Sequence, residues 1–510
     1  WLDAIRATRL GALALGATFN GPDLLAYCVG VTGAAGVEVV GALLWRRAAT
    51  VLILSCAVRG GSAGEGVWLR QTAEVHIGGA EAVELAGRPR NSVSPQLRLP
   101  DVEAGPSQGW RLAPVRERSR IEPRLVNYFH MDLPESRVDH LSERLAQWDI
   151  VILNDDLARR GKVSLARMRQ TNPRVRVLAW VPLQGPNDGL AHKVPGKGPR
   201  DWYARKADGT YFSPHWGGYL MNPCTQDWAW LRHVLRYVRE VCLRTGGYDG
   251  LMLDCLWPTE PPGLDVNGDG VCDRQDTVEW QSAMLFLLRK VRAEFGETIV
   301  VGNGGIPWPA DAPYYEFANG CMHENALGDQ FGGMEWSSLW SAYRMAVSKA
   351  MRRPMCHFIQ ADVRAGGRTQ KAAASLSALT PDDRRRFRVG LATSMLLDGG
   401  YFGFDRGDCL HGQLWWFDEY EMDLGKPVAV FEEGRWGPGV FSREFERGLV
   451  IVNPTLKPVR VQTDRSLSNA STPPSPDTYV VPAQDARILV RTHDAEGRTP
   501  TVHSASIPTR

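Results

Sequence analysis

From residue 121 onward, short apolar runs alternate with longer amphipathic segments, and this repeat restricts the folds that the chain can adopt. Eight apolar runs of strand length carry polar residues at or near their ends: LVNYFHMD, DIVILNDD, VRVLAWVPLQ, YDGLMLD, IVVGNGG, GCMHEN, PMCHFIQAD and YFGFDRGD. Helical patterns lie between most of them, at 135–148, 161–171, 226–245, 277–295, 336–351 and 381–397, whereas the short connection 306–320 shows no clear one. Continuous apolar strands that alternate with helices are typical of a parallel sheet buried on both faces. Eight such repeats predict an α/β fold, a (β/α)8 TIM barrel over residues 121–412, with its site at the C-terminal ends of the strands.

The regions on either side of this repeat differ from it. Residues 413–495 contain short runs separated by turn residues, which predict a small C-terminal antiparallel β-sandwich, and residues 496–510 are expected to be a disordered tail. Residues 1–120 are expected to be a signal-like, poorly ordered region. Within it, Arg46 and Arg47 precede an apolar run at 48–58 that small residues follow, as in a secretory signal. Export to the periplasm, cell surface or medium is therefore favoured over a membrane helix at 24–45.

One loop has the ligand spacing of a calcium site. In DVNGDGVCDRQD, residues 265–276, oxygen-bearing groups stand at positions 1, 3, 5, 7, 9 and 12, and glycine stands at position 6. Twelve-residue calcium loops take their ligands from these positions and need the glycine for a sharp turn. We therefore expect a structural Ca²⁺ ion held by Asp265, Asn267, Asp269, the carbonyl of Val271, Asp273 and Asp276. The alternative is a turn without metal, since Asn, Asp and Gly favour turns by themselves.

The overall composition argues against several classes of function. A net charge of +2 gives no electrostatic basis for binding nucleic acid. The sequence contains no fingerprint of an organic cofactor, and HENAL at 323–327 lacks the second histidine of a zinc protease motif. The nine cysteines form no CxxC pairs and no metal-like spacing with histidine, which argues against a disulfide framework.

Carboxylates at the predicted strand ends suit glycoside hydrolysis. That reaction needs one carboxylate to attack the sugar or activate water, and one carboxylic acid to protonate the leaving oxygen. Asp254 directly follows an apolar strand and Glu324 lies among polar residues at another strand end, so we expect this pair to be catalytic. Other polar and aromatic residues of these ends and loops are expected to bind the sugar: Asp132, Asp155, Asp156, Trp180, Trp202, Trp216, Trp257, Asn303, Gln360, Asp362, Asp405 and Arg406. For the aromatic residues of loop 185–225, a lid packed by its own side chains is an equal alternative.

Several segments resemble a known group of families. DWYARKADGTYF, YLMNP, YDGLMLD, VVGNGG and CMHEN together look like the bacterial hypothetical glycosyl hydrolase families, over about residues 121–460. The resemblance implies a TIM barrel distantly similar to α-galactosidases and endo-α-1,4-polygalactosaminidases, with carboxylates after the fourth and sixth strands. By that match, Asp254 is the nucleophile and Glu324 the acid/base of a retaining enzyme that cleaves an α-linked oligo- or polysaccharide.

Two other functions fit the same sequence. A non-catalytic carbohydrate-binding barrel would keep the cleft without turnover, although the many spare carboxylates argue against it. A structural cell-surface protein would be favoured if the N-terminal apolar run were a membrane anchor. The leading hypothesis is an exported, calcium-stabilised glycoside hydrolase that acts on carbohydrate and uses neither nucleic acid nor an organic cofactor.

Overall fold

The computed structural model describes residues 122–491 apart from 130–139, 184–201, 214–218, 245, 305–307, 325, 328–334, 350–351, 364–375, 406–410, 464–466 and 470–477. All described residues belong to one compact unit. None of the helices among them is both long and apolar enough to cross a membrane. The predicted N-terminal region 1–120, with both of its apolar segments, and the tail 496–510 lie outside the described residues.

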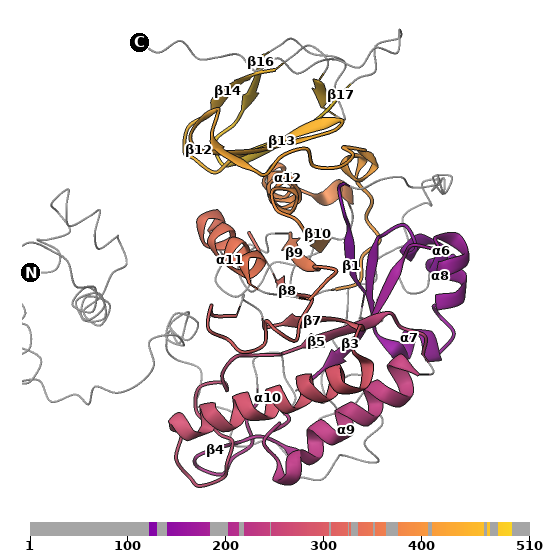
Figure 1. Cartoon of the computed structure of the whole chain (residues 1–510), viewed down its shortest axis with the longest axis vertical. Helices are drawn as coiled ribbons and strands as arrows, with labels where there is room; N and C mark the ends of the chain where they lie inside the picture. Colours follow the sequence, from indigo (N-terminus) through magenta and orange to yellow (C-terminus); the bar gives the residue numbers. More distant parts are fainter. Residues whose placement is uncertain are drawn as a thin grey trace, which may run out of the picture. The chain divides into compact units, whose positions relative to one another are not determined.

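Eight parallel strands form one sheet that closes into a barrel, as the repeat predicts (Figure 1). Neighbours along the chain are also neighbours in the sheet, and an isolated parallel bridge between Leu125 and Phe402 joins the last strand to the first. All eight predicted runs contribute a strand. In chain order the strands are β1 (Val126–Phe129), β2 (Ile150–Leu153), β3 (Arg176–Pro182), β5 (Gly250–Asp254), β7 (Ile299–Asn303), β8 (Gly320–His323), β9 (His357–Asp362) and β10 (Gly400–Asp405).

Helices follow most of these strands and cover the outside of the barrel. Among the residues described between β7 and β8, turns replace the helix, in agreement with the weak pattern there. A short helix directly after β2 was not predicted. The helices are α6 (Leu141–Leu145), α7 (Asp155–Arg159), α8 (Leu165–Thr171), α9 (Ala229–Tyr237) with a π-helical extension Val238–Leu243, α10 (Arg274–Phe295), α11 (Trp336–Ser348) and α12 (Pro381–Met395), besides 3-10 turns at Gln226–Trp228, Leu376–Ala378 and Asp418–Glu421.

Alternate residues of each strand face two different buried clusters. Met252, Val301, Met322 and Phe358 belong to the cluster inside the barrel, whereas their sequence neighbours pack toward the helices. Because side chains alternate across a strand, any residue an even number of positions away points to the same side. Asp254, two residues after Met252, therefore ends its strand on the inner face.

Seven further strands form antiparallel sheets after the barrel. β11 (Glu432–Gly434), β12 (Gly437–Phe445), β13 (Gly448–Asn453), β17 (Asp485–Arg491) and β15 (Leu467–Asn469) make one sheet in that order, and β14 (Val459–Gln462) pairs with β16 (Thr478–Val481). Helix α12 packs against β10 on one side and against β13 and β17 on the other (Figure 1). The Arg388 guanidinium of α12 contacts Asp485 of β17 at 2.7 Å. Antiparallel β-structure is thus present as predicted, while its assignment as a sandwich stays a prediction.

The remaining two-residue strands tie two long loops together. β4 (Arg205–Lys206), in the loop after β3, pairs antiparallel with β6 (Leu264–Asp265), in the loop after β5. The Asn222 side chain also donates to the carbonyl of Val266 at 2.9 Å. The third and fourth catalytic-face loops therefore hold each other in place.

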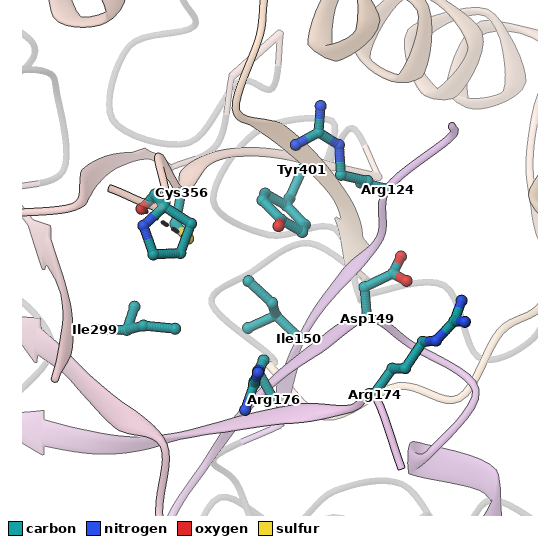
Figure 2. A pocket seen from close by; sticks show the side chains of 9 residues that line it. Arg124, Asp149, Ile150, Arg174, Arg176, Ile299, Cys356 and Tyr401 are labelled. Atoms are coloured by element: carbon teal, nitrogen blue, oxygen red, sulfur yellow. Dashed lines mark hydrogen bonds between the residues drawn. The ribbon is translucent and has the colours of Figure 1, made fainter. Parts of the chain in front are cut away.

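A hollow of about 410 Å³ opens at the opposite end of the barrel (Figure 2). Ile150, Arg176 and Ile299, which line it, are the first residues of their strands. The active sites of such barrels lie at the other, C-terminal end. This hollow is therefore not the candidate active site.

Candidate active site

Asp254 is held by four hydrogen-bond donors at the end of β5. Its Oδ2 accepts from the Tyr128 hydroxyl at 3.2 Å and from the Trp180 indole at 2.9 Å. Its Oδ1 accepts from the Asn303 amide at 2.8 Å and from the backbone N–H of Cys255 at 3.0 Å. Cys255 has a φ of 58°, a left-handed conformation that non-glycine residues rarely adopt. The carboxylate thus has one fixed orientation toward the barrel axis.

Asn303 connects Asp254 to Glu324. Its Nδ2 donates to Asp254 Oδ1 at 2.8 Å and to Glu324 Oε2 at 3.0 Å. Because both oxygens contact the same nitrogen, they cannot lie more than about 6 Å apart, a separation short enough for two carboxylates to act on one glycosidic bond. The two residues predicted to be catalytic are therefore neighbours in space, although 69 positions separate them in the sequence.

A buried histidine, His411, lies on the other side of Glu324. Its Nε2 is 3.2 Å from Glu324 Oε1, and its Nδ1 is 2.8 Å from Asp405 Oδ2. The same Asp405 oxygen accepts from the Gln360 amide at 2.8 Å. The imidazole stacks on the Tyr128 ring, with 4.1 Å between ring centroids. Gln360, Asp405, His411 and Glu324 therefore form one continuous hydrogen-bonded chain.

Burial and charge set the protonation of this group. Burial, and then the charge of Glu324, raise the pKa of Asp254, whereas its hydrogen bonds lower it. Burial by itself lowers the pKa of His411, but its hydrogen bonds and charge interactions with Asp405 and Glu324 outweigh burial and raise this pKa to about 10. At neutral pH His411 therefore carries a positive charge between two carboxyl groups. The Tyr128 hydroxyl stays protonated, because burial raises its pKa.

Asp362 is a further buried carboxyl group close to these residues. It pairs in register with Asp405 on the neighbouring strand, and its Oδ1 has no hydrogen-bond partner among the described residues. Burial raises the pKa of Asp362 to about 7, against the opposing charge of Arg386. Asp362 can therefore gain or lose a proton near neutral pH.

The structure gathers five of the predicted sugar-binding residues near Asp254 and Glu324 and places others elsewhere. These five, on the inner face or at the strand ends, are Trp180, Asn303, Gln360, Asp362 and Asp405. Asp155 and Asp156 begin α7 and pair with Arg159, and Asp155 also accepts from the Tyr237 hydroxyl of α9. Both thus lie in the helix layer, away from the pair. Asp132, Trp216 and Arg406 lie outside the described residues.

The predicted aromatic residues of the loops pack largely against protein. Trp202 contacts Trp230 of α9, with ring centroids 5.9 Å apart, and Trp257 stacks on Trp280 of α10 at 6.4 Å. Tyr203 and Tyr219 contact each other at 5.8 Å. These contacts favour a loop packed by its own aromatics, although Tyr219 keeps an exposed ring.

The predicted calcium loop has a well-defined backbone. Asp265 accepts from the N–H groups of Gly268 at 2.7 Å and Gly270 at 2.8 Å, and both glycines have positive φ. Asp273 caps α10, so Asp276 lies in the first turn of that helix, fully buried, and accepts from the Asp273 N–H at 2.8 Å. Among the described residues, the loop carboxylates form no group of three whose ligand atoms all lie within 4.8 Å. Calcium binding by Asp265, Asn267, Asp269, Val271, Asp273 and Asp276 stays a prediction.

Tyr128 and His411 are the site residues that sequence reasoning missed. Tyr128 lies two residues after Val126 in β1 and faces the same side of the strand, so strand alternation could have placed it inside the barrel. His411 follows the last barrel strand, a position where polar residues of such barrels often act. Neither residue stands in a motif, and only the closed barrel brings them to Asp254 and Glu324.

The chain was compared with known protein sequences, solved structures and family models. No curated protein sequence matches the chain. Among solved structures, the glycoside hydrolase domain of PelA from Pseudomonas aeruginosa is similar at 16% identity, covering 56% of this chain and 94% of that one, with a TM-score of 0.36. An Anoxybacillus α-amylase (11% identity, 73% and 98% covered, TM-score 0.38) and the cyclic α-maltosyl-(1→6)-maltose hydrolase of Arthrobacter globiformis (12%, 72% and 98%, 0.41) are also similar.

One family model matches the sequence of the chain. It spans residues 169–449, more than half of the chain, and includes Asp254, Asn303, Glu324 and His411. The chain therefore belongs to hypothetical glycosyl hydrolase family 15.

Proposed function

We propose that this glycosyl hydrolase cleaves an α-linked oligo- or polysaccharide with retention of configuration, Asp254 acting as nucleophile and Glu324 as acid/base. The observation that carries the proposal is the amide of Asn303, which donates to both carboxylates. Oxygens that share one nitrogen at these distances fit the separation of about 5–5.5 Å in retaining enzymes better than the 6.5–9.5 Å of inverting enzymes, which leave room for a water.

The first step forms a covalent glycosyl-enzyme. An Asp254 oxygen attacks the anomeric carbon while Glu324 gives a proton to the leaving oxygen, so one C–O bond forms as another breaks. The four donors around Asp254 restrict its rotation, which supports attack along one line. In the second step Glu324 takes a proton from water, and the water oxygen displaces Asp254.

His411 supplies the environment that this proton transfer needs. Its Nε2 and Glu324 Oε1 lie at hydrogen-bond distance, so a proton can pass between them without movement of either side chain. When Glu324 has given its proton away, the imidazolium stabilises the remaining carboxylate. Asp405 fixes the ring through Nδ1 and keeps Nε2 aimed at Glu324.

Two further properties belong to the same proposal. Loop 265–276 holds a structural Ca²⁺ ion. The loop begins at β6 and ends in the first turn of α10, and its sequence has the ligand spacing of a twelve-residue calcium loop.

The chain is exported, as Arg46, Arg47 and the apolar run 48–58 suggest. N-terminal sequencing of the mature protein would contradict a cleaved signal if the chain still began before residue 45.

The test is the stereochemistry of the first product. The full chain is screened against α-linked polysaccharides for release of reducing ends, and the anomeric configuration of the initial product is followed by NMR. We expect an α-configured product before mutarotation. A β-configured first product would refute the retaining assignment, and tight binding without release would favour a carbohydrate-binding barrel.

A further inference from the structure

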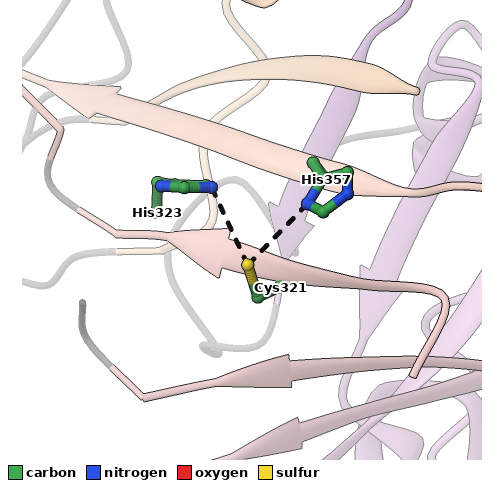
Figure 3. A group of neighbouring side chains, drawn as sticks. All are labelled: Cys321, His323 and His357. Atoms are coloured by element: carbon green, nitrogen blue, oxygen red, sulfur yellow. Dashed lines mark hydrogen bonds between the residues drawn. The ribbon is translucent and has the colours of Figure 1, made fainter. Parts of the chain in front are cut away.

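Three side chains on the outer face of the barrel form a polar group within the apolar layer under α11. Cys321 and His323 stand two residues apart on β8, and His357 begins the neighbouring strand β9 (Figure 3). All three are essentially inaccessible to solvent. The Tyr343 ring of α11 contacts both imidazoles, with centroids 5.6 Å from His323 and 5.9 Å from His357. The proposed reaction does not use this group, because its members point away from the barrel axis.

The three potential ligand atoms lie close together. Cys321 Sγ lies 3.8 Å from His323 Nε2 and 3.7 Å from His357 Nδ1, and all three atoms lie within 4.8 Å of one another. A tetrahedral zinc ion, with Zn–S near 2.3 Å and Zn–N near 2.0–2.1 Å, places sulfur and nitrogen about 3.5–3.6 Å apart. The two sulfur–nitrogen distances thus differ from those of a zinc site by about 0.1–0.3 Å. No other group of three His, Cys, Asp or Glu residues in the described part of the chain converges in this way.

We propose that Cys321, His323 and His357 bind a divalent ion of the zinc class, with a non-protein ligand or water in the fourth position. Thiolate and imidazole together are the ligands that select zinc over calcium or magnesium. The sequence gives no zinc motif here, because the ligands come from two strands and 33 residues separate the second histidine from the first.

Binding at this site needs two neutral imidazoles and a thiolate. The Cys321 thiol releases one proton to solvent as its sulfur bonds to the metal. His323 directly precedes Glu324, so the ion would brace the end of the strand that carries the acid/base.

The outer nitrogens of the two histidines limit the expected affinity. His323 Nδ1 and His357 Nε2 are buried and have no hydrogen-bond partner among the described residues. Ligand histidines usually donate through this second nitrogen, and losing such partners costs about 10–100-fold in affinity. We therefore expect weaker binding than in zinc sites that have these bonds.

The experiment loads the full chain during folding, since the site is buried. The protein is produced in medium with cobalt in place of zinc, and excess calcium in the purification buffers saturates loop 265–276. We expect about one equivalent of cobalt per chain, with the thiolate-to-cobalt charge-transfer absorption that only a cysteine ligand produces. Less than about one tenth of an equivalent after loading with either cobalt or zinc would overturn the proposal.

Cysteine variants assign the absorption to the site. Cys321→Ser should abolish the charge-transfer band, whereas Cys356→Ser should keep it, because Cys356 is a buried cysteine next to His357 whose thiol donates instead to the Pro354 carbonyl. A band that survives in Cys321→Ser would place the metal elsewhere and refute the site. If Cys321→Ser does not fold, His357→Gln provides the same comparison, since it removes a ligand and keeps every cysteine.

Discussion

His411 Nε2 lies 3.2 Å from Glu324 Oε1, and the two side chains are almost completely buried. A histidine in this position helps to orient the proposed acid/base. Because Asp405 holds the opposite nitrogen at 2.8 Å, the ring cannot turn without breaking a second bond. The acid/base is therefore the end of the hydrogen-bonded chain that runs from Gln360 through Asp405 and His411.

Replacing His411 by Asn should reduce kcat about 10²-fold for natural substrates, within the range for positioned proton transfer. The loss should be much smaller for activated aryl glycosides, whose leaving groups need little protonation. Because the pKa of His411 is about 10, the activity of the wild type should also fall as pH rises through 10. His411→Asn should not show this decrease. His140→Asn is the control, since His140 is exposed and directly precedes α6. Equal losses for both substrate types would indicate a structural role only.

Asp254→Asn should abolish turnover, by about 10⁴-fold or more, while sugar binding persists. Asparagine keeps the shape of the side chain but cannot form the glycosyl ester. Binding is measured by calorimetry and turnover by reducing-end release. Asp311→Asn, at an exposed position after β7, is the matched control and should behave as wild type. Nearly full activity in Asp254→Asn would refute the nucleophile.

Glu324→Gln should distinguish the two chemical steps. Glutamine can still accept from Asn303 but has no proton to give to the leaving oxygen. Substrates with poor leaving groups should slow at least about 10²-fold more than activated aryl glycosides. The measurement is kcat/KM over a series of leaving groups, and a series with the same slope as wild type would exclude Glu324 as the acid.

Strand alternation explains why some site residues could be predicted and others could not. Asp254 and Asn303 end apolar strands at inward-facing positions. Their location at the strand ends and the side of the sheet that they face therefore both follow from the sequence. Asp155 also follows a strand, but in β2 the inward positions are Ile150 and Ile152, so Asp155 lies on the side of the helix layer. The alternation of side chains along β2 would therefore have excluded Asp155 from the predicted site.

His411 could not be placed in this way, because loop geometry decides its position. The segment that carries it is held on the closed barrel: the Asn127 amide of β1 donates to the Gln413 carbonyl at 3.0 Å, and the Gln413 amide donates to the Phe404 carbonyl of β10 at 2.5 Å. The Tyr128 ring on which it stacks comes from the other end of the domain, 283 residues away in the sequence. The fold class follows from local periodicity, whereas this contact depends on closure.

Removal of calcium should destabilise the chain. A metal that binds only the native state stabilises it by mass action, by about 2.7 kcal/mol at 100 times Kd. The expected result is a lower Tm in chelator, restored by Ca²⁺ but not by Mg²⁺. Asp265→Ala should lower Tm by itself, because Asp265 accepts from Gly268 and Gly270, and it should remove the response to chelator. An unchanged wild-type Tm would contradict the calcium site.

Asp362 should make stability depend on pH near neutrality. Its pKa is about 7 in the folded protein, above the 3.8 of an ordinary aspartate, so the folded state binds the proton more tightly than the unfolded state. The stabilising contribution is therefore fully present below about pH 4 and is lost as pH rises through 7, a difference on the order of a few kcal/mol.

Asp362→Asn tests this, because asparagine stays neutral at every pH. Above pH 7 the variant should be more stable than wild type, and its free energy of unfolding should change less between pH 4.5 and 8.5. Asp382→Asn is the control: that carboxylate is half-exposed on α12 and lies 3.4 Å from Arg386, outside the site. Denaturant unfolding at several pH values gives the comparison. If Asp362→Asn and wild type kept the same pH dependence, Asp362 would be ionised in the folded protein throughout this range, and it could not serve as a proton donor near Glu324.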